Sequence, residues 1–171
     1  VIVGGSGGVF SAGADLKEVL PDPLMRVERM HRLVLRFTDL AMLTVAAIEG
    51  AAMGGGLELA LACDLRIASR TARLGLPEIG MGFFPAYGGT QLLPYTIGLS
   101  RAIEMVLGGE AVDAESALAI GLIDQVAATD AVAAARIRCA RFEQCRPTTV
   151  GAALHALRAG KHDRLLSGLP E

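Results

Sequence analysis

The apolar positions of this chain form two patterns, short uninterrupted runs and one stretch with helical spacing. Short apolar runs at 1–3, 44–48, 65–68 and 74–76 end at glycine, proline or polar residues, which predicts buried strands. Residues 24–40 carry apolar side chains at helical spacing, so an amphipathic helix is predicted between the first two runs. Strands and helices therefore alternate from the start of the chain.

Most of the later elements are predicted to be helices. The run at 57–63 is apolar on every side, so its helix is expected to be buried all round. Ser100 and Asp113 are expected to cap two of the later helices, and the alanine-rich region after residue 129 is expected to break at Pro147 and Gly160. The other predictions are helices at 91–97, 100–107 and 113–120, and a closing strand at 122–126.

Composition and charge narrow the function classes. Hydrophobic residues make up 52% of the 171 residues and charged residues 20%, which suits one domain with a real core. The formal net charge of −2 argues against nucleic acid as the main partner and against an anionic membrane surface, and no apolar run is long enough to span a membrane. Seven basic residues between 136 and 164 are expected to form a solvated helix face, with phosphate contacts as the alternative.

The cysteines point away from disulfides and metals. Cys63, Cys139 and Cys145 are odd in number and lack paired ligand spacing. We therefore predict no disulfide framework and no metal site. This usage fits a reducing compartment, the cytoplasm or a mitochondrial matrix reached through a targeting peptide outside this sequence.

Glu58 is the most informative single residue, because it interrupts the apolar run at 57–63. Burying an unpaired carboxylate is costly. Burial raises the pKa of such a group, whereas the first turn of a helix favours the anion. Two interpretations stay open: a general acid/base, or a structural ion pair with an arginine such as Arg66.

Gly54, Gly55 and Gly56 lie at the amino end of the same predicted helix. Free amides at such an end can bind an oxyanion, and glycines allow close approach. Tight packing of the helix on a strand explains the triplet equally well, so both interpretations stay open.

Glu78 follows a predicted strand and Pro77. Alone, it is more typical of a loop or a helix cap. If its strand lies in one sheet with the strand before Glu58, both turns emerge on the same side and the two carboxyls converge. Two carboxyls in one site push their pKa values apart, which supplies an acid and a base.

Three groups of residues form motifs that follow one another along the chain. The first is Phe-Ser-Ala-Gly-Ala-Asp-Leu-Lys at 10–17. The second is 47–60, which contains the glycine triplet and Glu58. The third combines Leu76-Pro77-Glu78 with 85–91. In this order they resemble the signatures of the enoyl-CoA hydratase/isomerase (crotonase) family, and the resemblance covers roughly three quarters of the chain.

The resemblance implies an α/β fold, a crotonase-like β-spiral of ββα units with a C-terminal helical extension. We expect an α/β core at 1–128 that lacks its first strands, and a truncated helical region at 129–171. The family's assembly implies a homotrimer or a dimer of trimers.

The resemblance also implies a site for an acyl-CoA thioester. The amides of Ala14 and Gly55 are expected to hold the thioester oxygen, and Glu58 and Glu78 to act as the catalytic carboxylates. The Ala86 amide is expected to help position the water. The remaining residues expected to bind substrate are Ser11, Ala12, Asp15, Leu16, Lys17, Gly54, Pro85 and Tyr87.

Retention of both glutamates favours an enoyl-CoA hydratase of fatty acid metabolism. Such an enzyme needs no metal or redox cofactor, since coenzyme A is part of its substrate. The alternatives are an enoyl-CoA isomerase on the same site, a catalytically silent acyl-CoA-binding scaffold, and RNA binding, which the mild acidity of the chain disfavours.

Overall fold

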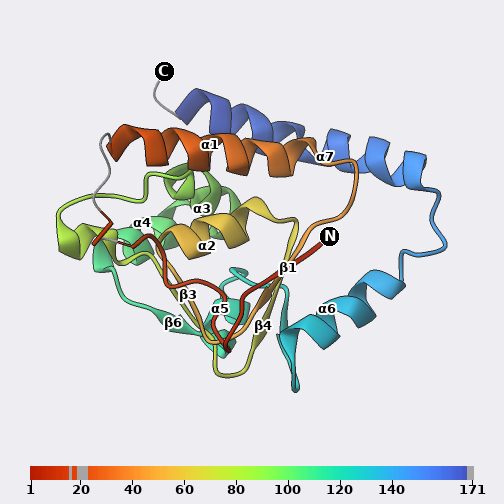
Figure 1. The fold of residues 1–171 in the computed structure, drawn as a ribbon, viewed down its shortest axis with the longest axis horizontal. Helices are drawn as coiled ribbons and strands as arrows, with labels where there is room; N and C mark the ends of the chain where they lie inside the picture. Colours follow the sequence, from red (N-terminus) through yellow and green to blue (C-terminus); the bar gives the residue numbers. More distant parts are fainter. Residues whose placement is uncertain (16, 19–22, 169–171) are drawn as a thin grey trace.

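The computed structural model describes residues 1–15, 17–18 and 23–168 of the chain. The strands form two sheets, one parallel with the order β1-β2-β4-β7 and one smaller with the order β3-β5-β6 (Figure 1). Only β6 runs antiparallel to its neighbour in the described sheets. Their bounds are β1 Ile2–Gly4, β2 Val45–Ile48, β3 Ala51–Met53, β4 Leu65–Ser69, β5 Arg73–Gly75, β6 Val112–Asp113 and β7 Gln125–Ala127.

A strand–strand–helix unit occurs twice in succession. Strands β2 and β3 lead into helix α2, and β4 and β5 lead into the short 3-10 helix η1. Gly50, in the turn between β2 and β3, has a φ of 56°, and a Cβ there would collide with the carbonyl oxygen of Gly8. The predicted spiral of ββα units is confirmed.

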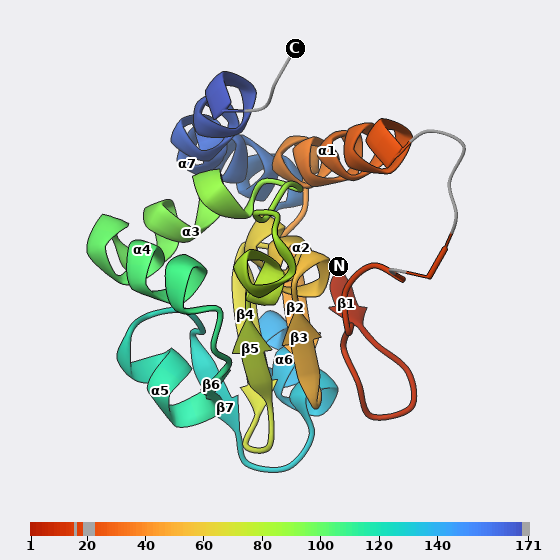
Figure 2. The same cartoon turned by 90° about the vertical axis from the view of Figure 1, so that its left-hand side faces the viewer.

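The other helices surround these sheets. Helices α1 and α7 lie side by side along one edge of the molecule (Figures 1 and 2). Helix α6 packs its alanines against β2 and β4. The helical bounds are α1 Pro23–Asp39, α2 Gly55–Ala62, η1 Pro77–Met81, α3 Gly89–Ile97, α4 Leu99–Gly108, α5 Ala114–Ala119, α6 Ala131–Ala140 and α7 Pro147–Gly168.

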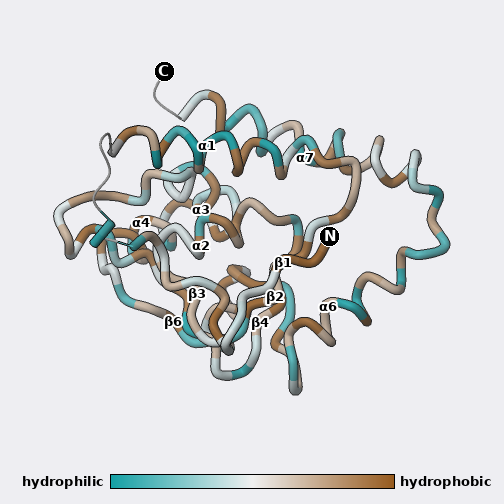
Figure 3. Tube along the Cα trace, viewed as in Figure 1, coloured by the Kyte–Doolittle hydropathy of each residue, from teal (hydrophilic) through white to brown (hydrophobic). Residues whose placement is uncertain are grey.

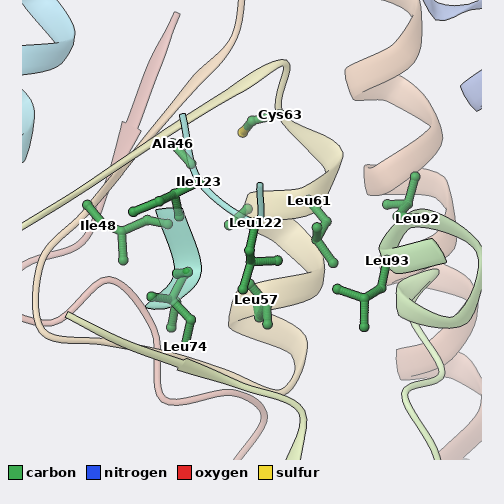
Figure 4. Packing of buried hydrophobic residues seen from close by; sticks show 14 of the residues in the cluster. Ala46, Ile48, Leu57, Leu61, Cys63, Leu74, Leu92, Leu93, Leu122 and Ile123 are labelled. Atoms are coloured by element: carbon green, nitrogen blue, oxygen red, sulfur yellow. The ribbon is translucent and has the colours of Figure 1, made fainter. Parts of the chain in front are cut away.

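Helix α2 lies at the centre of the core. Leu57 and Leu61 pack toward Leu92 and Leu93 of α3, with strand residues such as Leu74 close by (Figure 4). The strands are mostly apolar along their length, whereas the connection between α6 and α7 is largely hydrophilic (Figure 3). The expectation of a helix buried all round is confirmed for α2.

Several predicted details are wrong. In α1, Val34 is fully buried, but Leu24 and Leu33 are 67% and 39% exposed, so the core stripe is narrower than predicted. Helix α4 starts after Gly98 rather than at a Ser100 cap, and α7 continues through Gly160. The short strands β3 and β6 were not predicted, and the closing strand begins only at Gln125. No described helix is both long and apolar enough to cross a membrane.

The C-terminal basic residues do not all form a solvated face. Arg158 is 4% exposed and donates to both carboxylate oxygens of Asp64, and Lys161 is 8% exposed. The Nζ atom of Lys161 donates to the carbonyl oxygens of Leu61, Ala62 and Cys63, at 2.7, 2.7 and 3.1 Å. These are the carbonyls that the last turn of α2 leaves without helical partners, so Lys161 caps α2 and complements its dipole.

Substituting Lys161 by Met should lower the free energy of unfolding by about 2–3 kcal/mol, because buried carbonyls would lose their donor. Urea denaturation at pH 7 measures the change. Arg136→Met, on the exposed side of α6, is the matched control. A loss for Lys161→Met of less than about 0.5 kcal/mol, typical of surface positions, would contradict the capping role.

Candidate active site

A cavity of about 410 Å³ lies at the amino end of α2. Its wall is built from the loop after β1, the first turns of α1 and α2, helix η1, and the segment 83–87 that precedes α3. Both glutamates singled out by the sequence, Glu58 and Glu78, line it.

Glu58 lies in the first turn of α2 and is 1% exposed. Its Oε1 accepts hydrogen bonds from the amides of Tyr87 at 2.8 Å and Gly89 at 2.7 Å. Burial raises the pKa of Glu58 to about 7; the two amide hydrogen bonds oppose this rise and the charge of Glu78 adds to it. The carboxyl is therefore poised to gain or lose a proton near neutral pH.

The alternative interpretation of Glu58, an ion pair with Arg66, is wrong. The Arg66 guanidinium donates to the carbonyls of Leu122 and Cys63 and lies 3.4 Å from a carboxylate oxygen of Asp124. Glu58 is thus held by neutral amides alone, which leaves its charge without a counter-ion among the described residues.

Glu78, in helix η1, reaches the same cavity from the next strand–strand–helix unit. Strands β3 and β5 are parallel neighbours, with Met53 opposite Gly75, so the segments that follow them leave the sheet at one edge (Figure 2). The convergence predicted from the sequence is confirmed, although the strand before Glu58 is β3 rather than the run at 44–48. Glu78 is 6% exposed, and burial raises its pKa. Its Oε2 accepts no hydrogen bond from the described part of the chain.

Each glycine of the triplet leaves room for a different group. A Cβ at Gly54 would lie 2.9 Å from Oε1 of Glu78, one at Gly55 2.8 Å from the Tyr87 ring, and one at Gly56 2.6 Å from the Ser11 Cβ. Gly54 also has a φ of 53°. The packing interpretation is therefore correct for Gly56, whereas Gly54 and Gly55 allow the cavity groups to approach the helix.

The loop that contains Ala14 lies close to the amino end of α2, where Gly55 begins the helix. The loop containing Ala14 runs beside β3, through hydrogen bonds of Ser11 with Ala51 and Met53. A Cβ at Gly13 would lie 3.8 Å from the Gly55 nitrogen. Neither the Ala14 nor the Gly55 amide has an acceptor within the described ranges. Two such donors can receive negative charge on a carbonyl oxygen.

Of the other residues predicted to bind substrate, some line the cavity and some do not. Ala12, Gly54, Ala86 and Tyr87 line the cavity with the residues above. Leu16 lies outside the described residues. The predicted residues Ser11, Asp15, Lys17 and Pro85 do not line the cavity. No group of three or more His, Cys, Asp or Glu residues that could hold a metal occurs in the described ranges.

Some site groups were not predicted from the sequence. The Tyr87 and Gly89 amides act through the backbone, which leaves no side-chain signal. His31 of α1 fixes the same loop, because its Nε2 lies 2.5 Å from the Ala86 carbonyl oxygen. Arg26 also lines the cavity from α1. Helical periodicity alone could not place either residue at the site.

Replacing Glu58 by Gln should make stability depend less on pH. The folded pKa of Glu58, about 7, lies above its ordinary value of 4.5, so the folded protein binds more protons between these values. The parent should therefore lose up to about 3 kcal/mol of unfolding free energy, relative to Glu58→Gln, as the pH rises from 4.5 to 7. Urea denaturation at pH 5 and pH 8 measures this difference, with the exposed Glu104→Gln as the matched control. A parent–variant difference that is independent of pH would contradict the assigned shift.

Comparison with known proteins identifies the family of this chain. Residues 1–169 match the family model for enoyl-CoA hydratase/isomerase. A Bacillus subtilis protein described as a probable enoyl-CoA hydratase is 39% identical over 168 residues, which cover 94% of this chain and 65% of that protein. The chain thus spans about two thirds of the length of that relative.

Two solved structures share the fold. DspI of Pseudomonas aeruginosa matches with a TM-score of 0.88 and 39% identity, over 99% of this chain and 67% of that one. A Thermobifida fusca structure solved in complex with CoA matches with a TM-score of 0.84 and 30% identity, over 97% of this chain and 72% of that one. With the family model matching nearly from end to end, this chain belongs to the enoyl-CoA hydratase/isomerase family.

Proposed function

We propose that this site catalyses the reversible addition of water to a 2-enoyl-CoA thioester. The observation that carries the proposal is the pair of buried carboxyls, Glu58 and Glu78, with raised pKa values in one cavity with two amides free of acceptors within the described ranges. Coenzyme A as the carrier is supported by the similar structure solved in complex with CoA.

In the proposed reaction, the thioester oxygen accepts hydrogen bonds from the Ala14 and Gly55 amides. Ionised Glu58 takes a proton from a water molecule positioned with the help of the Ala86 amide, and the water oxygen bonds to the β-carbon. The C=C electron pair moves toward the thioester and forms an enolate, whose charge the two amides stabilise. Protonated Glu78 then delivers its proton to the α-carbon, which restores the thioester carbonyl.

The two glutamates suit these different roles because their surroundings differ. Glu58 is fixed by two amides that favour its anion, as a base for water requires. The Oε2 of Glu78 is buried without a partner among the described groups, and burial raises the pKa of Glu78, so this carboxyl keeps its proton to a higher pH than an exposed glutamate does. The reaction uses no metal or redox cofactor, since coenzyme A is part of the substrate.

The proposal predicts that the chain hydrates crotonyl-CoA and that Glu78→Gln lowers kcat by at least about 100-fold, the scale of a lost general acid. Loss of the enoyl-thioester absorbance measures the rate. Glu110→Gln, on a carboxyl that does not line the cavity, is the matched control. No hydration by the parent, while crotonyl-CoA still raises its melting temperature, would contradict hydration and favour an isomerase or a silent scaffold.

Glu58→Ala separates hydration from double-bond isomerisation. Hydration needs a base for water, so kcat with crotonyl-CoA should fall by at least about 100-fold. Isomerisation moves one proton between two carbons and can proceed on Glu78 alone. Conversion of a 3-enoyl-CoA to the 2-enoyl form is therefore measured in parallel. Full hydration activity in Glu58→Ala would contradict the assigned role of Glu58.

A further inference from the structure

The cavity contains one positively charged side chain among the described residues, and the proposed hydration does not use it. This cation is Arg26, at the end of the first turn of α1. Its side chain is 23% exposed. Much of the surrounding wall is apolar, including Val27, Met81 and Phe84. A guanidinium costs free energy in such a place unless it has a charged or polar partner.

Tyr87 connects Arg26 with the catalytic end of the cavity. The edge of its ring lies against Gly55, where a Cβ would be 2.8 Å from two ring carbons. The Arg26 guanidinium lies near its hydroxyl and opposes the larger rise in the pKa of Tyr87 that burial causes. The Tyr87 ring therefore lies between Gly55 and the guanidinium.

The existing partners of Arg26 leave donors for a ligand. Its Nη2 donates to Oε2 of Glu18 at 2.7 Å, but the Glu18 side chain is 55% exposed, and a pair this accessible to water adds little stability. The guanidinium carries five N–H groups in a planar fork. Among the described residues, Glu18 accepts from one nitrogen of this fork, which leaves other N–H groups for an anion.

We propose that Arg26, with the Tyr87 hydroxyl, binds a carboxylate at the far end of the acyl group, so that the substrate is a short-chain acyl-CoA with an acidic terminus. This inference rests on the proposed function, because it takes the thioester oxygen to lie at the Ala14 and Gly55 amides. The acyl chain then runs along the Tyr87 ring, and its carboxylate meets the guanidinium. A planar carboxylate matches the guanidinium fork.

Such a site should discriminate by charge rather than by size. An acyl group that ends in an amide of equal size keeps the shape but loses the charge-assisted hydrogen bonds, and the half-buried Arg26 would remain unpaired on that side. A phosphate of coenzyme A is the other anion that could reach Arg26. It is present in every acyl-CoA, so comparing two acyl ends on the same carrier separates the two sources.

The test measures binding without turnover. Dissociation constants are determined by calorimetry for glutaryl-CoA and for its terminal amide, both saturated and therefore not substrates for hydration. The parent should bind the acid at least about tenfold more tightly than the amide, and Arg26→Met should remove this preference. Arg26→Lys should restore part of it. Arg29→Met, an exposed arginine one turn away that does not line the cavity, should retain it.

The inference would be overturned if the parent bound the acid and the amide equally, or if the preference for the acid survived Arg26→Met. If Arg26→Met weakened both ligands equally, Arg26 would be assigned to a phosphate of coenzyme A instead. Crotonyl-CoA hydration is assayed on the same samples. Hydration without an acid preference rejects this inference alone, and an acid preference without hydration rejects the proposed reaction alone.

Discussion

The site depends on one carboxylate oxygen, Oε1 of Glu58, held between two backbone amides at 2.8 and 2.7 Å. These hydrogen bonds join the first turn of α2 to the segment that leads into α3. They fix where Tyr87 and Gly89 can lie, and therefore where the Tyr87 ring packs. Gly89 must be a glycine, since a Cβ there would lie 2.8 Å from the same carboxylate oxygen. The bonds that tune the proton affinity of Glu58 thus also shape the cavity.

The carboxyl end of α2 is also fixed by hydrogen bonds. Its last carbonyls accept from Lys161, and Arg158, one turn earlier on α7, binds Asp64 just beyond the helix. Asp64 in turn accepts from the backbone and hydroxyl of Thr44, at the start of β2. Helix α7 therefore fixes the helix whose opposite end carries Glu58 and the Gly55 amide. This explains why buried cations in the C-terminal region matter for a site formed mainly by the first ninety or so residues.

Much of the fold and the centre of the site could be predicted from the sequence. Glu58 could be identified because burying a charged residue inside an apolar helix costs free energy unless the residue has a partner or a function. Glu78 could be identified because residues that follow neighbouring parallel strands emerge at the same edge of the sheet. Lys161 and Arg158 were misassigned, because no local pattern shows that the end of a distant helix lacks donors. Arg26 and the Tyr87 amide were missed for a related reason. Their roles depend on how α1 and the segment at 83–88 cross the cavity, and only tertiary packing decides that.

Glu58 is a buried carboxyl poised to change its charge near neutral pH. A ¹³C NMR titration of glutamate-labelled protein, with Glu58→Gln to assign the resonance, measures its pKa directly. We expect a value near 7, against an ordinary value of 4.5, and a lower value in Glu78→Gln, where the neighbouring charge is absent. A Glu58 carboxyl that titrates at its ordinary value, unaffected by Glu78→Gln, would contradict this assignment.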